Sequence, residues 1–226
     1  MIDFLKRTDS TTLSYARLRQ CVGLVALFLP FALALPWALW GQPAPGHPVL
    51  DSISAYYYTG MRDLFVGSLC AISMFMLACR GYDLGDEIAG VASGICALGV
   101  AFFPCDCGTL PPCVANDFFA NTKVIHYIFA GLLFTILAIF CLFLFTRTGP
   151  AGKEARTPRK AQRNVVYVVC GWAIVVSILV IGASNFLLPA YTILGFAPNF
   201  FFETTSLLAF GLAWLVKGET FLKDKP

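Results

Sequence analysis

The sequence predicts an all-α fold, a polytopic bundle of six transmembrane helices with both termini in the cytoplasm. Three observations predict it: an apolar composition, six apolar runs of spanning length, and basic residues that alternate from loop to loop. Of the 226 residues, 58% are hydrophobic and 13% are charged, whereas a soluble domain carries about 25% charged residues. A chain with this few charged residues has too little polar surface to form a soluble globule. We therefore expect the protein to lie in a lipid membrane.

Six apolar segments follow one another along a chain that fits a single domain, residues 1–226. Each is about 17 to 24 residues long, close to what a hydrocarbon core of about 30 Å requires. The predicted spans are residues 21–40, 61–79, 88–104, 124–146, 165–188 and 199–216. Around them we expect a cytoplasmic leader at 1–20, an external cysteine-containing loop at 105–123 and a basic cytoplasmic loop at 148–164.

Lysine and arginine predict the orientation, because loops that remain in the cytoplasm are rich in them. With the N-terminus inside, only Arg62 and Lys123 of the 16 basic residues fall outside, which leaves 14 inside. The inside set is Lys6, Arg7, Arg17, Arg19, Arg80, Arg147, Lys153, Arg156, Arg159, Lys160, Arg163, Lys217, Lys223 and Lys225. We therefore expect a multi-pass protein of the cell membrane, in bacteria the inner membrane.

The external loop contains Cys105, Cys107 and Cys113 in the run CDCGTLPPC. A compartment outside the cytoplasm permits disulfides, so we expect Cys113 to pair with Cys105 or Cys107. A redox-active or copper-binding loop is the alternative, because a CxC pair can exchange partners or supply soft ligands.

Small residues recur in the third predicted span. Gly90 and Gly94 form a GxxxG motif, with Ser93, Ala97 and Ala101 on the adjacent row. Such residues allow helix backbones to approach closely, and we interpret them as packing positions.

Ionisable residues near one predicted depth are the candidates for a functional site. An α-helix rises about 1.5 Å per residue. Counted from the basic residue at the cytoplasmic end of each span, this rise places Asp63, His126 and Glu203 in the outer third of the membrane. The residues before the second span add Ser54, Tyr57, Tyr58 and Arg62 at the same level. Together these seven side chains could form one polar pocket that opens to the external side.

Each candidate also has a structural interpretation. Tyrosines at an interface form aromatic belts, Asp63 could pair with Arg62 or favour a helix N-terminus, and His126 could anchor its helix. Glu203 could be a capping carboxylate after an Asn199 N-cap. Glu203 is nevertheless the strongest functional candidate, because ionisable residues within spans are costly and usually functional.

Several motifs resemble those of an uncharacterised bacterial family of six-helix membrane proteins, of the domain-of-unknown-function type. They are SISAYYY with MRDLFVG, GVAFFP, HYIFAGLLF, and FFETTSLLAFGLAWLVKG. A more distant resemblance is to the DRAM/Frag-type membrane proteins. The resemblance covers nearly the whole chain and implies a fold and a location, but no activity.

The favoured hypothesis is a small transporter, channel or sensor whose external pocket takes a proton, a cation or a small polar ligand. The alternatives are a membrane enzyme that uses acid–base chemistry on lipid or another outer-leaflet substrate, and a structural or assembly factor. The bundle could also form a homodimer. Two histidines, His47 and His126, cannot supply a three-histidine zinc site. We expect no metal, no cofactor and no nucleic acid partner.

Overall fold

The computed structural model describes residues 2–41, 48–78, 83–105, 117–147, 158–186 and 197–222, without the side chains of 2–15, 117–121 and 186. These residues form helices and no strand, so the predicted all-α class is confirmed. The α-helices are α1 (Ile2–Trp40), α2 (Arg62–Ala78), α3 (Leu84–Phe102), α4 (Asp117–Ile139), α5 (Pro158–Phe186) and α6 (Pro198–Lys217). A short 3-10 helix, η1 (Ser54–Tyr58), precedes α2, and a π-helical turn, η2 (Phe140–Leu144), ends the fourth segment.

Five of the helices are long and apolar enough to cross a membrane. They are Ala16–Trp40 of α1, α3, Thr122–Leu144, Pro158–Asn185 of α5, and α6. The second predicted span forms α2 (Arg62–Ala78), which is not among these five. Residues 79–82, which follow it, lie outside the described residues. Five of the six predicted spans are therefore supported by length and composition.

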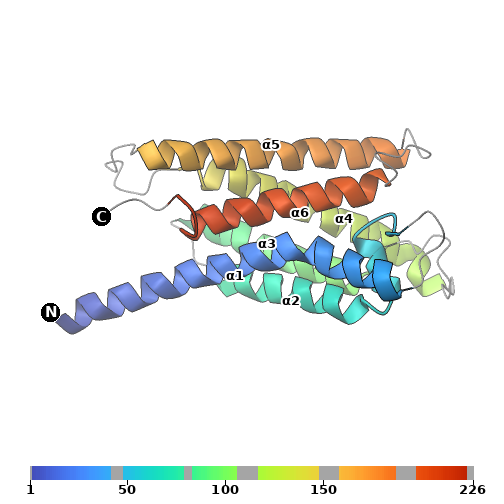
Figure 1. Cartoon of the computed structure of the whole chain (residues 1–226), viewed down its shortest axis with the longest axis horizontal. Coiled ribbons are helices and arrows are strands. Elements are labelled where there is room, and N and C mark those ends of the chain that lie inside the picture. Colours follow the sequence, from blue (N-terminus) through green and yellow to red (C-terminus); the bar gives the residue numbers. More distant parts are fainter. Residues whose placement is uncertain are drawn as a thin grey trace.

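The six α-helices form a closed ring in sequence order. Each helix packs against the next one along the chain, and α6 closes the ring against α1. The start of α1 and the end of α6 lie at the same end of the bundle (Figure 1). We call this end the basic end, and the opposite end, where η1 lies, the η1 end.

Three predicted boundaries differ from the observed ones. The predicted leader is helical and continuous with the first span, because α1 begins at residue 2. Part of the predicted basic loop is helical as well, since α5 begins at Pro158. Likewise α4 begins at Asp117, inside the predicted external loop. In all three places a polar helical segment extends an apolar one, and hydropathy alone detects only the apolar part.

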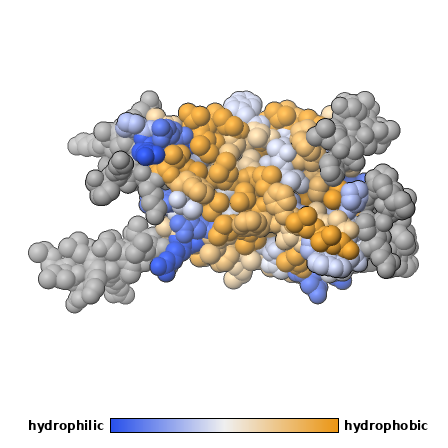
Figure 2. Space-filling model, viewed as in Figure 1, coloured by the Kyte–Doolittle hydropathy of each residue, from blue (hydrophilic) through white to orange (hydrophobic). Residues whose placement is uncertain are grey.

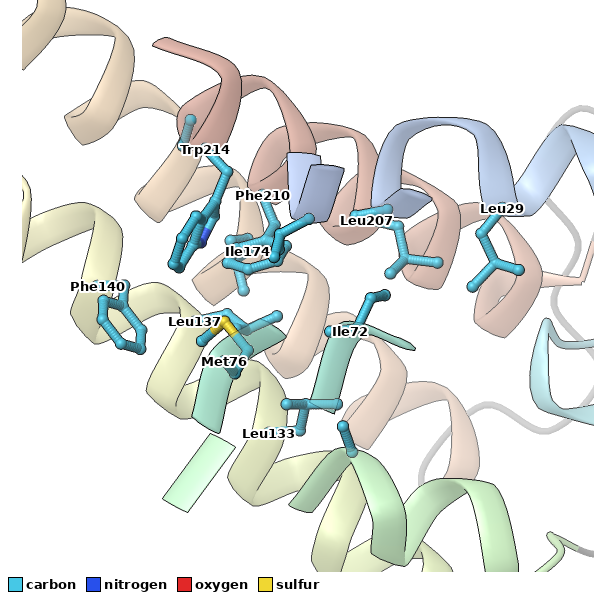
Figure 3. Close-up of a cluster of buried hydrophobic side chains, with 14 of the residues drawn as sticks. Leu29, Ile72, Met76, Leu133, Leu137, Phe140, Ile174, Leu207, Phe210 and Trp214 are labelled. Atoms are coloured by element: carbon cyan, nitrogen blue, oxygen red, sulfur yellow. The ribbon is translucent and has the colours of Figure 1, made fainter. Parts of the chain in front are cut away.

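The centre of the ring is filled with apolar side chains. Ile72, Leu137, Ile174 and Phe210 come from four different helices, are at most 5% exposed, and point toward one another (Figure 3). The outside is apolar as well: Figure 2 shows a broad hydrophobic band between more hydrophilic ends. A helix bundle that is apolar both inside and outside is suited to lipid rather than to water.

Small residues allow two pairs of helices to approach closely. On α3, the small residues of the predicted packing stripe are buried, and the Ser73 hydroxyl of α2 donates to the Gly94 carbonyl at 2.8 Å. Between α1 and α6, a Cβ added at Gly211 would lie 2.8 Å from the Gly23 carbonyl oxygen. The interpretation of the α3 stripe as packing positions is confirmed.

Candidate functional site

The η1 segment connects three helices at one end of the bundle. It follows α1 and precedes α2 (Figure 1), and the backbone at its start is hydrogen-bonded to α6. Ser54, Ala55 and Tyr56 are buried. A 3-10 helix repeats every three residues, so Ile53 and Tyr56 lie on the same face, and they are 4% and 0% exposed.

Glu203 of α6 accepts hydrogen bonds from the first amides of this segment. The Ile53 N–H donates to the Glu203 Oε2 at 2.6 Å, and the Ser54 N–H donates to the same carboxylate. In return, the Phe200 N–H in the first turn of α6 donates to the Asp51 carbonyl at 2.9 Å. The amides at the start of a helix have no partner within the helix. Glu203 of α6 therefore satisfies amides at the start of η1, and Asp51, just before η1, satisfies an amide in the first turn of α6.

Glu203 therefore caps a helix, but a different helix from the one it belongs to. The predicted N-cap of α6 was Asn199, whereas the observed N-cap is Ala197, without a side-chain cap, and Pro198 is in the first turn. Proline is favoured at this position because its missing N–H would have no helical partner.

Two tyrosines connect the other end of η1 to its surroundings. The Tyr58 hydroxyl donates to the Cys105 carbonyl at 2.6 Å, just after the end of α3. The Tyr57 hydroxyl accepts from the Arg62 guanidinium at 2.8 Å, and that guanidinium lies 4.5 Å from the centre of the Tyr57 ring. Hydrogen bonds thus link η1 to the start of α2 and to the residues after α3.

His126 of α4 is 2% exposed and caps the end of α3. Its Nδ1 lies 2.7 Å from the Phe103 carbonyl oxygen, and the Val100 backbone also forms a hydrogen bond with the ring. The last carbonyls of a helix have no hydrogen-bond partner within the helix, and lipid chains cannot provide one. The imidazole of His126 provides that partner at the end of α3.

The candidates thus have separate partners. Glu203 and Ser54 meet through the Ser54 amide, and Tyr57, Tyr58 and Arg62 lie together. His126 instead contacts the end of α3. Asp63 is exposed in the first turn of α2. All of these contacts lie at the η1 end, and most of them satisfy backbone groups.

Tyr56 belongs to this site but is not among the seven candidate residues. Its ring is fully buried and meets Trp37 of α1 edge-on, with ring centres 6.4 Å apart. Burial raises the pKa of Tyr56 to about 12, and the hydrogen bond from the Leu50 N–H lowers it by less. The side chain is therefore a neutral phenol at physiological pH. The three-residue spacing from Ile53 is the signal that could have identified it.

Further oxygen atoms lie on the same face of α6 as Glu203. Asn199 and Ser206 are four residues before it and three after it, spacings that share one helix face. In the part of the chain that the structure describes, Asn199 Oδ1 and Ser206 Oγ are buried without a hydrogen-bond partner. Buried polar atoms usually have such a partner. These two oxygen atoms on α6 can therefore still accept a hydrogen bond.

The predicted disulfide is not supported. Cys105 is buried directly after the end of α3, and the described residues contain no disulfide. Cys107 and Cys113 lie outside the described residues.

The fold and this arrangement define a class, a multi-pass helical membrane protein with an ionisable residue in one span that caps a neighbouring short helix. No protein-family model, curated protein or solved structure matches the chain. The resemblance to the six-helix bacterial family stays a prediction.

Proposed function

We propose that this protein is a sensor in the cell membrane that responds to protons or a small cation at the η1 end. The observation that carries the proposal is the hydrogen bonding of the Glu203 carboxylate to the Ile53 and Ser54 amides. Through these bonds a single ionisable group in α6 holds the segment between α1 and α2. A change in the charge of Glu203 would therefore alter contacts that involve α6, α1 and α2.

The proposed orientation places the η1 end outside the cell, with α2 as the sixth span and both termini in the cytoplasm. The distribution of basic residues supports this orientation. At the basic end, the charges of Arg19, Lys160 and Arg163 act on Lys217. Arg62 instead lies at the η1 end beside Tyr57.

Among transporter, channel and sensor, the apolar centre of the ring favours a sensor. Met76, Leu133 and Trp214 lie there together with the central cluster of the four helices (Figure 3). Ions cross a membrane along polar or water-filled paths, and these side chains provide neither. A signal from the η1 end would instead travel as a movement of α6 against α1 and α5, its two main neighbours.

Protonation of Glu203 supplies the first step of such a movement. An ionised carboxylate only accepts hydrogen bonds, whereas the protonated acid gains an O–H donor and loses its charge. The two amides of η1 then lose a charged acceptor, and hydrogen bonds to charged groups are the stronger ones. The new O–H can donate to an acceptor on the same face of α6, where Asn199 Oδ1 and Ser206 Oγ have capacity.

A cation could act at the same place. The Glu203 carboxylate, Asn199 Oδ1 and Ser206 Oγ are oxygen ligands of the kind that hard cations prefer. Such a cation would compete with the two η1 amides for the carboxylate, so it would release η1 as protonation does.

Hydrogen exchange of the full-length protein in lipid nanodiscs tests the proposal. The exchange rates of the Ile53 and Ser54 amides are measured against that of Phe65, whose N–H donates to the Met61 carbonyl in the first turn of α2. On acidification their protection relative to Phe65 should fall by about ten-fold or more, since a hydrogen bond to a charged group contributes about 1.5–3 kcal/mol.

The matched variants are Glu203→Gln and Asp63→Asn. The glutamine keeps the shape of the side chain but cannot titrate, so the two amides should show the same relative protection at every pH. Asp63 is an exposed carboxylate at the same end, and its variant should respond as the wild type does. A pH response that persists in Glu203→Gln would refute the proposal, as would its loss in Asp63→Asn.

A flux measurement separates a sensor from a transporter. Vesicles that contain the protein and a trapped pH dye should show no more proton entry than empty vesicles. Proton entry that requires the protein and disappears in Glu203→Gln would assign transport to Glu203 instead.

A further inference from the structure

Basic side chains from four segments meet at the basic end, around the last residue of α6. The charges of Arg19 on α1 and of Lys160 and Arg163 on α5 act on Lys217, the last residue of α6. Lys160 Nζ also donates to the carbonyl of Arg147, which follows η2, at 2.9 Å. We call these five residues (Arg19, Arg147, Lys160, Arg163 and Lys217) the basic cluster.

The helix ends hold this cluster in place. The Gln20 side chain of α1 donates to the Gly218 carbonyl after α6 at 2.8 Å, and Arg163 donates to the Leu222 carbonyl at 3.1 Å. Because these contacts link α1, α5 and the residues after α6, the cations are brought together by the fold of the bundle and not by adjacency in the sequence.

Two acidic residues lie beside the basic cluster. Asp83 and Asp86 lie at the start of α3, and Arg147 lies 2.8 Å from Asp83 and 3.9 Å from Asp86. Asp83 also caps α3 by accepting from the Asp86 N–H. Among the described residues, the charges that act on Lys217 are those of the basic Arg19, Lys160 and Arg163 and of the acidic Asp86.

The basic cluster lies partly inside the protein. Lys160 and Asp86 are 9% and 8% exposed, and Lys217 Nζ lies 5.5 Å from the centre of the Phe145 ring. Like charges repel more strongly in such surroundings than in water, so an anion at this end would lower the repulsion within the cluster.

The position of the cluster indicates the chemistry of that anion. Lys217 ends an apolar helix that is long enough to span a membrane. In Figure 2 the hydrophilic atoms at the ends of the molecule border directly on the hydrophobic band. The phosphates of lipid headgroups lie at this boundary, and basic pockets between transmembrane helices bind anionic headgroups.

We propose that the basic cluster binds the headgroup of an anionic phospholipid in the adjacent leaflet. The phosphate would lie among Arg19, Lys160, Arg163 and Lys217, and the acyl chains would lie along the apolar outer surface of the bundle. The proposal is independent of the function proposed for Glu203, because it concerns the opposite end of the molecule.

The probe is the full-length protein in mixed vesicles of phosphatidylcholine and phosphatidylglycerol. After extraction in mild detergent, native mass spectrometry measures which lipid the protein retains. We expect phosphatidylglycerol to be enriched over its share in the vesicle. Each cation removed should lower this enrichment about five-fold, since a basic residue near the membrane surface contributes about 1 kcal/mol to the attraction of anionic lipid.

Three variants make the result specific. Lys217→Gln should lose most of the enrichment, Lys217→Arg should keep it because the charge remains, and Arg62→Gln at the η1 end should retain wild-type enrichment. An excess of inorganic phosphate during extraction separates a lipid from a free phosphate: it should not displace the retained lipid. Equal retention of both lipids by the wild type would overturn the proposal, as would full enrichment in Lys217→Gln or displacement by phosphate.

Discussion

The two ends of the bundle use polar residues in opposite ways. At the η1 end, Glu203, His126 and Tyr58 each form a hydrogen bond with a backbone group at a helix end or just beyond one. At the basic end, charged side chains of several helices act on one another, and two of them also donate to backbone carbonyls. Irregular backbone near lipid must be satisfied by the protein, so the η1 end is held by directional hydrogen bonds. The basic end gathers charge instead, and charge acts over a longer range.

This difference has a consequence for how each end should respond to its surroundings. A buried hydrogen bond is insensitive to salt, whereas electrostatic attraction to a lipid surface falls off within a Debye length of about 8 Å at physiological ionic strength. The η1 end should therefore respond to protonation and local substitution, and the basic end to salt and lipid composition. The following variants test this division, from the largest expected effect to the smallest.

The largest effect should come from the contact between α1 and α6, because α6 carries Glu203 at one end and Lys217 at the other. In Gly211→Ala the new Cβ would lie 2.8 Å from the Gly23 carbonyl oxygen and 2.9 Å from the Leu27 amide nitrogen. Backbone atoms cannot move aside as a side chain can, so we expect a loss of about 1–3 kcal/mol of stability. Both the pH response of η1 and the lipid enrichment should be weakened.

Thermal unfolding in nanodiscs measures this effect, and Gly131→Ala is the control. A Cβ added at Gly131 of α4 meets nothing within 4 Å, so this variant should be as stable as the wild type. If Gly211→Ala disturbs only one end, α6 does not connect the two ends mechanically.

An intermediate effect should come from His126, and it should be confined to the η1 end. His126→Ala removes the side chain that satisfies the Phe103 carbonyl, and a buried polar group left without its partner costs about 1–3 kcal/mol. Thermal unfolding measures the loss, while lipid enrichment should remain at the wild-type level.

Ile128→Ala serves as the control for that variant, since Ile128 lies on the same helix and is 56% exposed. It should change stability by less than about 0.5 kcal/mol. A loss of lipid enrichment in His126→Ala would contradict the separation of the two ends.

The sequence predicted the parts of this structure that depend on composition. Five helices that are long and apolar enough to span a membrane, and the placement of Arg62 and Lys217 at opposite ends, follow from hydropathy and from the distribution of charge. The small residues of α3 were also interpreted correctly, because a spacing of four residues is a local pattern. These features require no knowledge of which helices are neighbours.

The partners of the candidate residues could not be predicted in the same way. Glu203 binds amides 150 residues earlier in the chain, and His126 binds the carbonyl of a residue 23 positions away. Backbone groups are present at every residue, so the sequence does not reveal which of them will lack a partner. Depth in the membrane placed Asp63, His126 and Glu203 at one level, but it could not determine the direction of each side chain around its helix.

The smallest effect should come from Tyr58, whose hydroxyl donates to the Cys105 carbonyl. Tyr58→Phe keeps the ring and removes the donor, so we expect a loss of about 0.5–1.5 kcal/mol in thermal unfolding. Tyr57→Phe is the matched control, because the Tyr57 hydroxyl accepts from the exposed Arg62 and exposed charged contacts contribute little. The loss in Tyr58→Phe should be the same at low and high salt, whereas the lipid enrichment at the basic end should fall as salt rises. A salt-dependent loss in Tyr58→Phe would show that charge, and not a directional hydrogen bond to the backbone, holds η1 against the end of α3.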